Sequence, residues 1–220
     1  MPFVLPDEAS RAIRAVGDAE GVTMFMIGLA AVALAVRVTV PATEDVTVGV
    51  ALANRSSVDA QALIGPFVNI LPVRVSTPAD MTVRELLRSA RTAMLDAFAF
   101  QDVPFDRVMQ AVHPGVPLGS YGPKNGEPFF RICVDFTEAA DAPAAAGSAL
   151  AVMPFHADDA VSGCDLYVSF SGAGSTMRGF VVYSAELFDR GTITSFLDRM
   201  QTILGSLDRQ LNRRLSQVRP

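Results

Sequence analysis

Apolar residues recur at helical spacing in several stretches of this sequence. Between residues 83 and 98 they stand three or four positions apart, with arginines in the gaps, which places them on one stripe of a helix. Thr82 and Glu85 mark its start at the spacing of a capping box, in which each side chain accepts the backbone N–H of the other residue. Similar patterns predict helices over residues 7–20, 24–37, 105–112 and 192–211.

Alternating and continuous apolar runs predict the β-strands. Residues 45–52 alternate valine and leucine with smaller side chains, as a half-buried strand does. Residues 67–75 are apolar on both faces, which predicts a central strand. Further strands are predicted over residues 129–136, 165–170 and 177–184, the last two separated by a hairpin-like break at residues 171–175.

The order of these elements indicates the fold class. Helices interleave with strands early in the chain, and strands pair late, which predicts an α/β fold: a two-layer sandwich with a mixed β-sheet covered by helices. The sequence shows no internal repeat and no domain boundary. Glycine, proline and alanine dominate residues 118–128 and 139–148, which are predicted to form loop and extended segments.

Composition limits the kinds of partner. The formal net charge is −5, Lys124 is the single lysine, and the arginines are scattered, so no basic surface for nucleic acid is expected. The mean hydropathy of +0.32 is high. It predicts either a large core or an apolar face that meets a partner, which includes a second copy in a homo-oligomer.

The chain is expected to be cytoplasmic and not membrane-bound. The apolar run Met24–Val36 covers 13 residues, whereas a membrane span needs roughly 20. The first residues lack the charged start and apolar block of a signal peptide. Cys133 and Cys164 stand in apolar surroundings and are predicted to be buried thiols rather than a disulfide framework.

Residues suited to catalysis are scarce. His113 precedes Pro114 and is expected to cap a helix or face solvent, while His156 is expected to lie in an acidic loop. A metal site needs three or four convergent ligands, and the spacing around His156 matches no such signature. The sequence also lacks a serine-nucleophile elbow, a dinucleotide loop and a Walker loop. We therefore predict no catalytic residue and no metal ligand.

Three blocks follow one another in a fixed order: Val48–Arg55 (VGVALANR), Ile64–Arg74 (IGPFVNILPVR) and Phe100–Asp106 (FQDVPFD). In this order they resemble conserved blocks of the condensation domains of nonribosomal peptide synthetases. Cys164–Leu166 (CDL) and Tyr183–Asp189 (YSAELFD) resemble later segments of the same family.

The resemblance has three departures within these blocks. In the second block, Ile70 replaces the family's threonine or glutamine. In the third block, Phe100 replaces a histidine or asparagine, and Val103 replaces a tyrosine.

The resemblance implies that residues 1–220 are the carboxy-terminal lobe of a two-lobed domain, with a chloramphenicol-acetyltransferase-like fold. The whole domain would join acyl or aminoacyl thioesters carried on the phosphopantetheine of peptidyl or aryl carrier proteins. The family's His-His-x-x-x-Asp-Gly block belongs to the amino-terminal lobe. By the same resemblance, the carboxy-terminal lobe would bind no cofactor directly and would supply one wall of the substrate tunnel between the two lobes. It would contact carrier proteins, the amino-terminal lobe or neighbouring synthetase domains. A latch crossing between the lobes is expected around residues 137–163.

The matching residues are candidates for binding or structural roles, with a structural role favoured. Asn69 and Arg74 stand in an apolar strand, where buried polar groups must be paired. Arg55 follows a strand end and is predicted to pair with a carboxylate, and Gln101 and Asp102 are predicted to form a turn before a helix. The candidate set is Asn54, Arg55, Gly65, Phe67, Asn69, Arg74, Gln101, Asp102, Pro104, Phe105 and Asp165.

Three functions remain open. The first is a non-catalytic lobe that binds partners. The second is one half of an acyltransferase, completed by a separate amino-terminal lobe or by self-assembly. The third is a self-contained acyltransferase, which the missing histidine motif disfavours.

Overall fold

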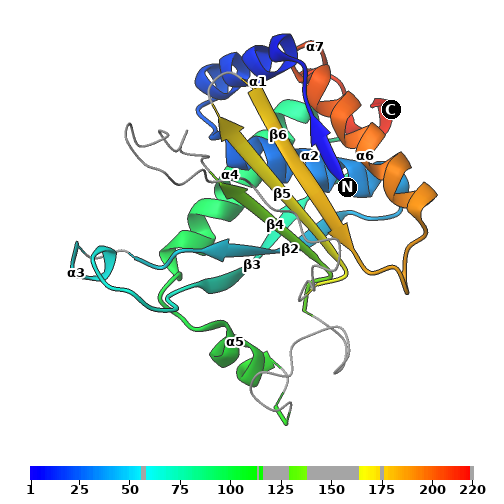
Figure 1. Cartoon of the computed structure of the whole chain (residues 1–220). Coiled ribbons are helices and arrows are strands. Elements are labelled where there is room, and N and C mark those ends of the chain that lie inside the picture. Colours follow the sequence, from blue (N-terminus) through cyan, green and yellow to red (C-terminus); the bar gives the residue numbers. More distant parts are fainter. Residues whose placement is uncertain (56–57, 113, 116–128, 138–163, 174–175, 219–220) are drawn as a thin grey trace, which may run out of the picture.

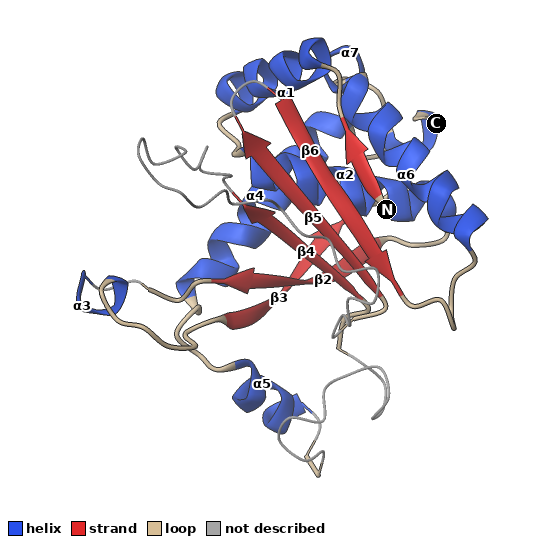
Figure 2. Cartoon of the chain, viewed as in Figure 1, coloured by secondary structure: helices blue, strands red, loops and turns tan. Residues whose placement is uncertain are grey.

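The structure is a computed structural model that describes residues 1–55, 58–112, 114–115, 129–137, 164–173 and 176–218. Its centre is a sheet whose strands lie in the order β1 (Pro2–Val4), β6 (Thr176–Tyr183), β5 (Leu166–Ala173), β4 (Ile132–Thr137), β2 (Asp45–Leu52) and β3 (Asn69–Ser76). Behind this sheet in Figures 1 and 2 lie four helices together: α1 (Asp7–Glu20), α2 (Met24–Thr39), α4 (Val83–Ala99) and α6 (Arg190–Gly205). The predicted two-layer α/β sandwich is confirmed.

The sheet is mixed. β2 (Asp45–Leu52) is parallel to β4 (Ile132–Thr137), which is parallel to β5 (Leu166–Ala173). The outer pairs are antiparallel: β2 with β3 (Asn69–Ser76), β5 with β6 (Thr176–Tyr183), and β6 with the short β1 (Pro2–Val4). The sequence pattern did not reveal β1, because three residues are too few to show a period.

The prediction that residues 67–75 form a central strand is wrong. β3 stands at the end of the strand order of the described sheet. One of its faces carries Leu71, Val73 and Val75, which are buried in the core. Its other face is apolar because Ile70 and Pro72 line a pocket shared with neighbouring helices, not because strands flank it on both sides.

The core is built around α2 (Met24–Thr39), in which every residue from Met26 to Ala35 is buried. It packs against α4 (Val83–Ala99) and α6 (Arg190–Gly205) on its flanks and against the sheet. A Cβ on Gly28 would lie 2.9 Å from the Phe170 ring, so the glycine lets the Phe170 ring of β5 pack directly against α2. Among the described helices, none is by itself long and apolar enough to cross a membrane.

The helix ends follow the local signals. α1 (Asp7–Glu20) ends at Gly21, whose φ of 67° is left-handed. The predicted capping box opens α4: the Thr82 N–H donates to Glu85 Oε2 at 2.8 Å, and the Glu85 N–H donates to Thr82 Oγ1 at 3.3 Å. The predicted helix 192–211 instead divides at Ser206, whose φ of −127° is not helical, into α6 and α7 (Leu207–Gln210).

The two cysteines largely follow their prediction. Both are free thiols; Cys164 is buried and Cys133 is half-buried. Contact with Cys164 and burial raise the pKa of the Cys133 thiol. The predictions for His113, His156, the segments 118–128 and 139–148, and the latch at 137–163 fall wholly or almost wholly outside the described residues.

Candidate functional site

Asn69 joins two of the three sequence blocks into one structural unit. From the start of β3, its Nδ2 donates to the carbonyls of Gln101 at 2.9 Å and Val103 at 2.8 Å. Its Oδ1 accepts the N–H of Phe105 at 3.1 Å. All three bonds go to the backbone of one turn, so Asn69 fixes where α5 (Phe105–Val112) begins.

The predicted turn before α5 is confirmed. Residues 101–103 turn, and the Pro104 carbonyl then accepts the Arg107 N–H at 2.9 Å. Phe105 turns its ring toward Phe130, with the ring centroids 5.4 Å apart. Phe130 in turn covers Gly49 on β2, where a Cβ would come within 2.3 Å of the ring. These contacts seat α5 against the sheet.

Among the described residues, Arg55 pairs with backbone carbonyls and not with the carboxylate that was predicted. Its Nη1 donates to the carbonyls of Ala60 and, at 2.7 Å, Leu63, and its Nη2 donates to the carbonyl of Gly65 at 3.2 Å. Its Cζ lies 4.4 Å from the centroid of the Phe67 ring. No carboxylate is needed because the loop itself turns its carbonyls toward the guanidinium.

This loop forms an arm, defined here as residues 53–55 and 58–68. It leaves the end of β2 at Asn54, which has a left-handed φ of 49°, carries the single turn α3 (Val58–Gln61), and returns to β3. In Figure 1 the arm projects beyond the sheet, away from the helix layer. Asn54, Arg55, Gly65 and Phe67 therefore belong to one substructure, which the sequence blocks did not indicate.

The apolar strand around Arg74 predicted a buried side chain, but Arg74 is exposed. Its side chain is 73% exposed and forms an ion pair of 2.7 Å with Asp45 on β2. The hydrogen bond from Arg74 lowers the pKa of the Asp45 carboxyl. The Cβ of Arg74 lies on the face of β3 opposite to the core, which explains the exposure.

Asp165 is a buried charge, with 2% of its side chain exposed. Its Oδ2 accepts a bond of 2.8 Å from Arg131, a partner that sequence reasoning missed because 34 residues separate them. Its backbone carbonyl accepts the N–H of Ser184, so Asp165 also joins the ends of β5 and β6. The role of Asp165 in the structure is to anchor the start of β5.

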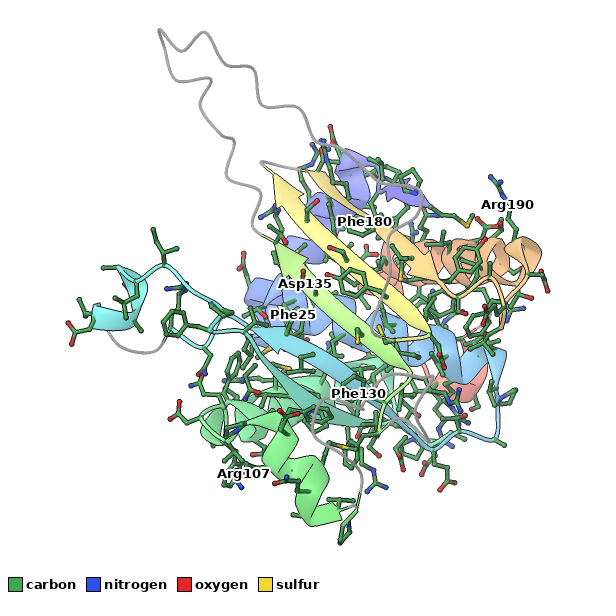
Figure 3. All side chains as sticks on the ribbon, turned by 60° about the horizontal axis from the view of Figure 1, so that its bottom comes forward. Phe25, Arg107, Phe130, Asp135, Phe180 and Arg190 are labelled. Atoms are coloured by element: carbon green, nitrogen blue, oxygen red, sulfur yellow. The ribbon has the colours of Figure 1, made fainter. Side chains whose placement is uncertain are left out.

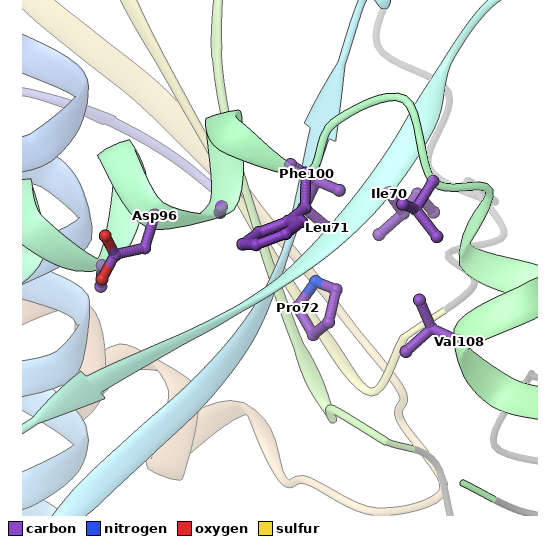
Figure 4. A pocket seen from close by; sticks show the side chains of 9 residues that line it. Ile70, Leu71, Pro72, Asp96, Phe100 and Val108 are labelled. Carbon is purple, nitrogen blue, oxygen red and sulfur yellow. The ribbon is translucent and has the colours of Figure 1, made fainter. Parts of the chain in front are cut away.

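The three residues that depart from the family pattern line one pocket. Ile70, Phe100 and Val103 meet there with residues of β3, α4 and α5 (Figure 4). Its volume is about 380 Å³, and Asp96 supplies the charged group of its lining. The sequence blocks showed these three positions only as separate departures from the family pattern. The fold shows that all three side chains line the same pocket.

The face of the sheet opposite to the helix layer carries polar groups. Tyr167 on β5 donates to Asp135 Oδ2 on β4 at 3.0 Å and packs against Phe180 on β6, with ring centroids 6.1 Å apart. Burial and the Asp135 carboxylate raise the pKa of the Tyr167 hydroxyl, which therefore stays a hydrogen-bond donor. Figure 3 shows Asp135 and Phe180 over this face.

The described residues contain no group of three histidine, cysteine or acidic side chains able to hold a metal ion. The structure brings Asn69, Gln101, Pro104 and Phe105 together in one unit and places Asp165 at the opposite end of the sheet. Their part in binding a substrate or partner stays a prediction.

Comparison with known proteins gives a consistent result. The sequence profile of the condensation domain family matches residues 2–219. The chain is 32% identical over 186 residues to cyclosporin synthetase simA of Tolypocladium inflatum, which covers 84% of this chain and 1% of that protein. It is 31% identical over 197 residues to malpinin synthetase of Mortierella alpina, covering 90% of this chain and 2% of that protein.

Among solved structures, the X-domain from teicoplanin biosynthesis superposes with a TM-score of 0.81 at 22% identity. The match covers 100% of this chain and 49% of the X-domain chain. The fold is thus that of condensation domains, as expected from the chloramphenicol-acetyltransferase-like resemblance. The chain spans about half the length of the solved structure, 1% of cyclosporin synthetase simA and 2% of malpinin synthetase.

Proposed function

The chain belongs to the condensation domain family, and we propose that residues 1–220 are the carboxy-terminal lobe of such a domain in nonribosomal peptide synthesis. The complete domain forms an amide bond between two carrier-bound thioesters. This lobe supplies a tunnel wall and a surface for partners, and a second lobe supplies the catalytic histidine. The match to one half of the X-domain chain supports this division.

The observation that carries the proposal is the exposed apolar surface of the arm. Val58, Leu63, Ile64 and Val68 are all more than half exposed, and Ile64 is exposed completely. They stand on a loop that projects from the sheet and makes no contribution to the core. Clustered apolar side chains of this kind mark surfaces that bind another protein. We propose that the arm docks on the amino-terminal lobe.

Carrier proteins are the second class of proposed partner. Their phosphopantetheine arm would bring the thioester to the tunnel, and this lobe would hold no cofactor of its own. The polar sheet face around Tyr167 and Asp135 offers donors and acceptors beside an aromatic pair, which suits a chain with amide groups. The X-domain from teicoplanin biosynthesis forms a complex with OxyB, which supports a role for this fold in binding other proteins.

The lobe interface is testable by mixing. An amino-terminal half can be made from the segment that precedes the matched 197 residues of malpinin synthetase. We expect it to bind this chain, and Ile64→Asp to weaken the complex at least about tenfold because it places a charge in an apolar interface. Leu187→Asp is the matched control, since Leu187 is also exposed and lies outside the arm.

Two results would contradict the proposal. One is an Ile64→Asp variant that binds the amino-terminal half as tightly as the wild type. The other is amide formation from carrier-bound substrates by this chain alone, which would show that the catalytic group is already present.

An acyltransferase completed by self-assembly is the second candidate. The same exposed arm favours it, because an apolar surface can be covered by another copy of the chain. Sedimentation velocity distinguishes the two: a stable oligomer that Ile64→Asp dissociates supports self-assembly, and a monomer at high concentration excludes it.

A further inference from the structure

Arg55 stands at the root of the arm and holds the arm together. The guanidinium donates to the carbonyls of Ala60, Leu63 and Gly65. It also lies over the Phe67 ring at 4.4 Å. The side chain thus bridges the outgoing limb, the turn α3 and the returning limb.

The arm has few other means of holding one shape. α3 is four residues long and contains no buried residue, whereas isolated helices shorter than about 12 residues are marginal in water. The last carbonyls of a helical turn lack partners within it. The guanidinium donates to the Ala60 carbonyl in α3 and to the Leu63 and Gly65 carbonyls in the returning limb. Its planar set of donors is one that a lysine ammonium does not reproduce.

We infer that Arg55 is a positioning residue that holds the arm in its docking shape before a partner binds. This inference rests on the proposed docking of the arm on the amino-terminal lobe. A loop that is ordered in advance loses less conformational entropy on association, so the same apolar contacts give tighter binding. Arg55 itself contributes through the shape of the arm and not through contact with the partner.

The test compares Arg55→Ala and Arg55→Lys with Arg209→Ala. Arg209 is the matched control because it too donates to a backbone carbonyl, that of Gly205, but lies outside the arm. Hydrogen exchange of residues 58–68 in the free chain reports the order of the arm. Titration with the amino-terminal half from malpinin synthetase reports its docking.

For Arg55→Ala we expect faster exchange of the arm amides, an unchanged melting temperature, and binding weaker by about tenfold, the scale of ordering a few side chains on association. Arg55→Lys falls between Ala and wild type, and Arg209→Ala matches the wild type in both measurements.

The outcomes separate the two ideas. If Arg55→Ala leaves arm exchange or affinity unchanged while Ile64→Asp weakens binding, the inference is overturned and the docking proposal stands. If Ile64→Asp has no effect on binding, the docking proposal fails, whatever Arg55 does to the exchange rates.

Discussion

Phe170 and Ile64 are both large apolar residues, yet Phe170 is 0% exposed and Ile64 is 104% exposed. Phe170 lies on β5 between α2 and Phe3, inside the helix-backed sheet. Ile64 lies on the arm, whose shape depends on hydrogen bonds to Arg55. Burial of apolar side chains stabilises the core between the sheet and the helices. Hydrogen bonds from the Arg55 guanidinium to backbone carbonyls stabilise the arm. Mutations should therefore affect stability in the first region and association in the second.

The largest expected effect is in the sheet interior. Phe170→Ala should lower the free energy of unfolding by about 3–5 kcal/mol, because it removes a fully buried ring that meets Phe3 edge-on at 5.7 Å. Phe100→Ala is the matched control, since Phe100 is 69% exposed and its removal should change stability by less than about 0.5 kcal/mol. Urea unfolding measures both, and equal losses would refute the comparison.

The Asn69 unit lies between these extremes. Asn69→Ala removes three hydrogen bonds to the turn before α5 and should cost about 2 kcal/mol, because backbone groups of the turn lose their partners. Asn69→Asp keeps the acceptor for the Phe105 N–H but turns a carboxylate toward two carbonyls, so it should not restore the lost stability. Denaturant unfolding gives the free energy, and hydrogen exchange should be faster in residues 105–112. An unchanged exchange rate there would remove Asn69 from the positioning of α5.

The same contrast explains what the sequence could predict. β2 and α5 were predicted with the bounds that the structure has, because local periodicity and Pro104 determine them. The misplaced β3 and the wrong partner of Arg55 have another cause. They depend on which segments come together in space: Ile70 and Pro72 meet helices instead of a strand, and the arm turns its own carbonyls toward Arg55.

The candidate site divides in the same way. The sequence blocks identified Asn69 and Gln101–Phe105 as candidates. Their contact could not be predicted, because more than thirty residues separate the bonded groups and only the fold brings them together. Arg131, which balances the buried Asp165, carried no signal, because an arginine before a strand is ordinary. The pocket beside β3 is likewise a property of packing, since its lining comes from separate elements.

The Asp165–Arg131 pair provides a smaller test. Arg131→Met should lower stability by about 1 kcal/mol, because it leaves a buried carboxylate without its cation, while the 62% exposure of Arg131 weakens the pair by solvent screening. Replacing both residues, as Asp165→Asn with Arg131→Met, should recover part of the loss. If the double variant loses more free energy of unfolding than the two single variants lose together, the ion pair is not the source of the effect.

The smallest expected effect is the loss of stability at low pH when the carboxyl of Asp189, the N-cap of α6, is protonated. The backbone N–H of Thr192 donates to Asp189 at the start of α6 and lowers the pKa of that carboxyl from its ordinary value of 3.8. A carboxyl whose pKa is lower in the folded state adds stability above its unfolded pKa and loses it as the pH falls through the folded pKa. The melting temperature of the wild type should therefore fall more steeply below pH 3.8 than that of Asp189→Asn, which still caps the helix without titrating.

The hydrogen bonds of the arm should respond differently to the same acid, since a guanidinium and carbonyls do not change protonation in this range. The arm also carries the carboxyl of Asp59, so the comparison is made in an Asp59→Asn background. Arm exchange, corrected for the intrinsic pH dependence of amide exchange, should stay constant over the interval in which the cap weakens. A matching loss of order in the arm would mean that its shape depends on the α6 end of the molecule, and the separation of the two regions would be wrong.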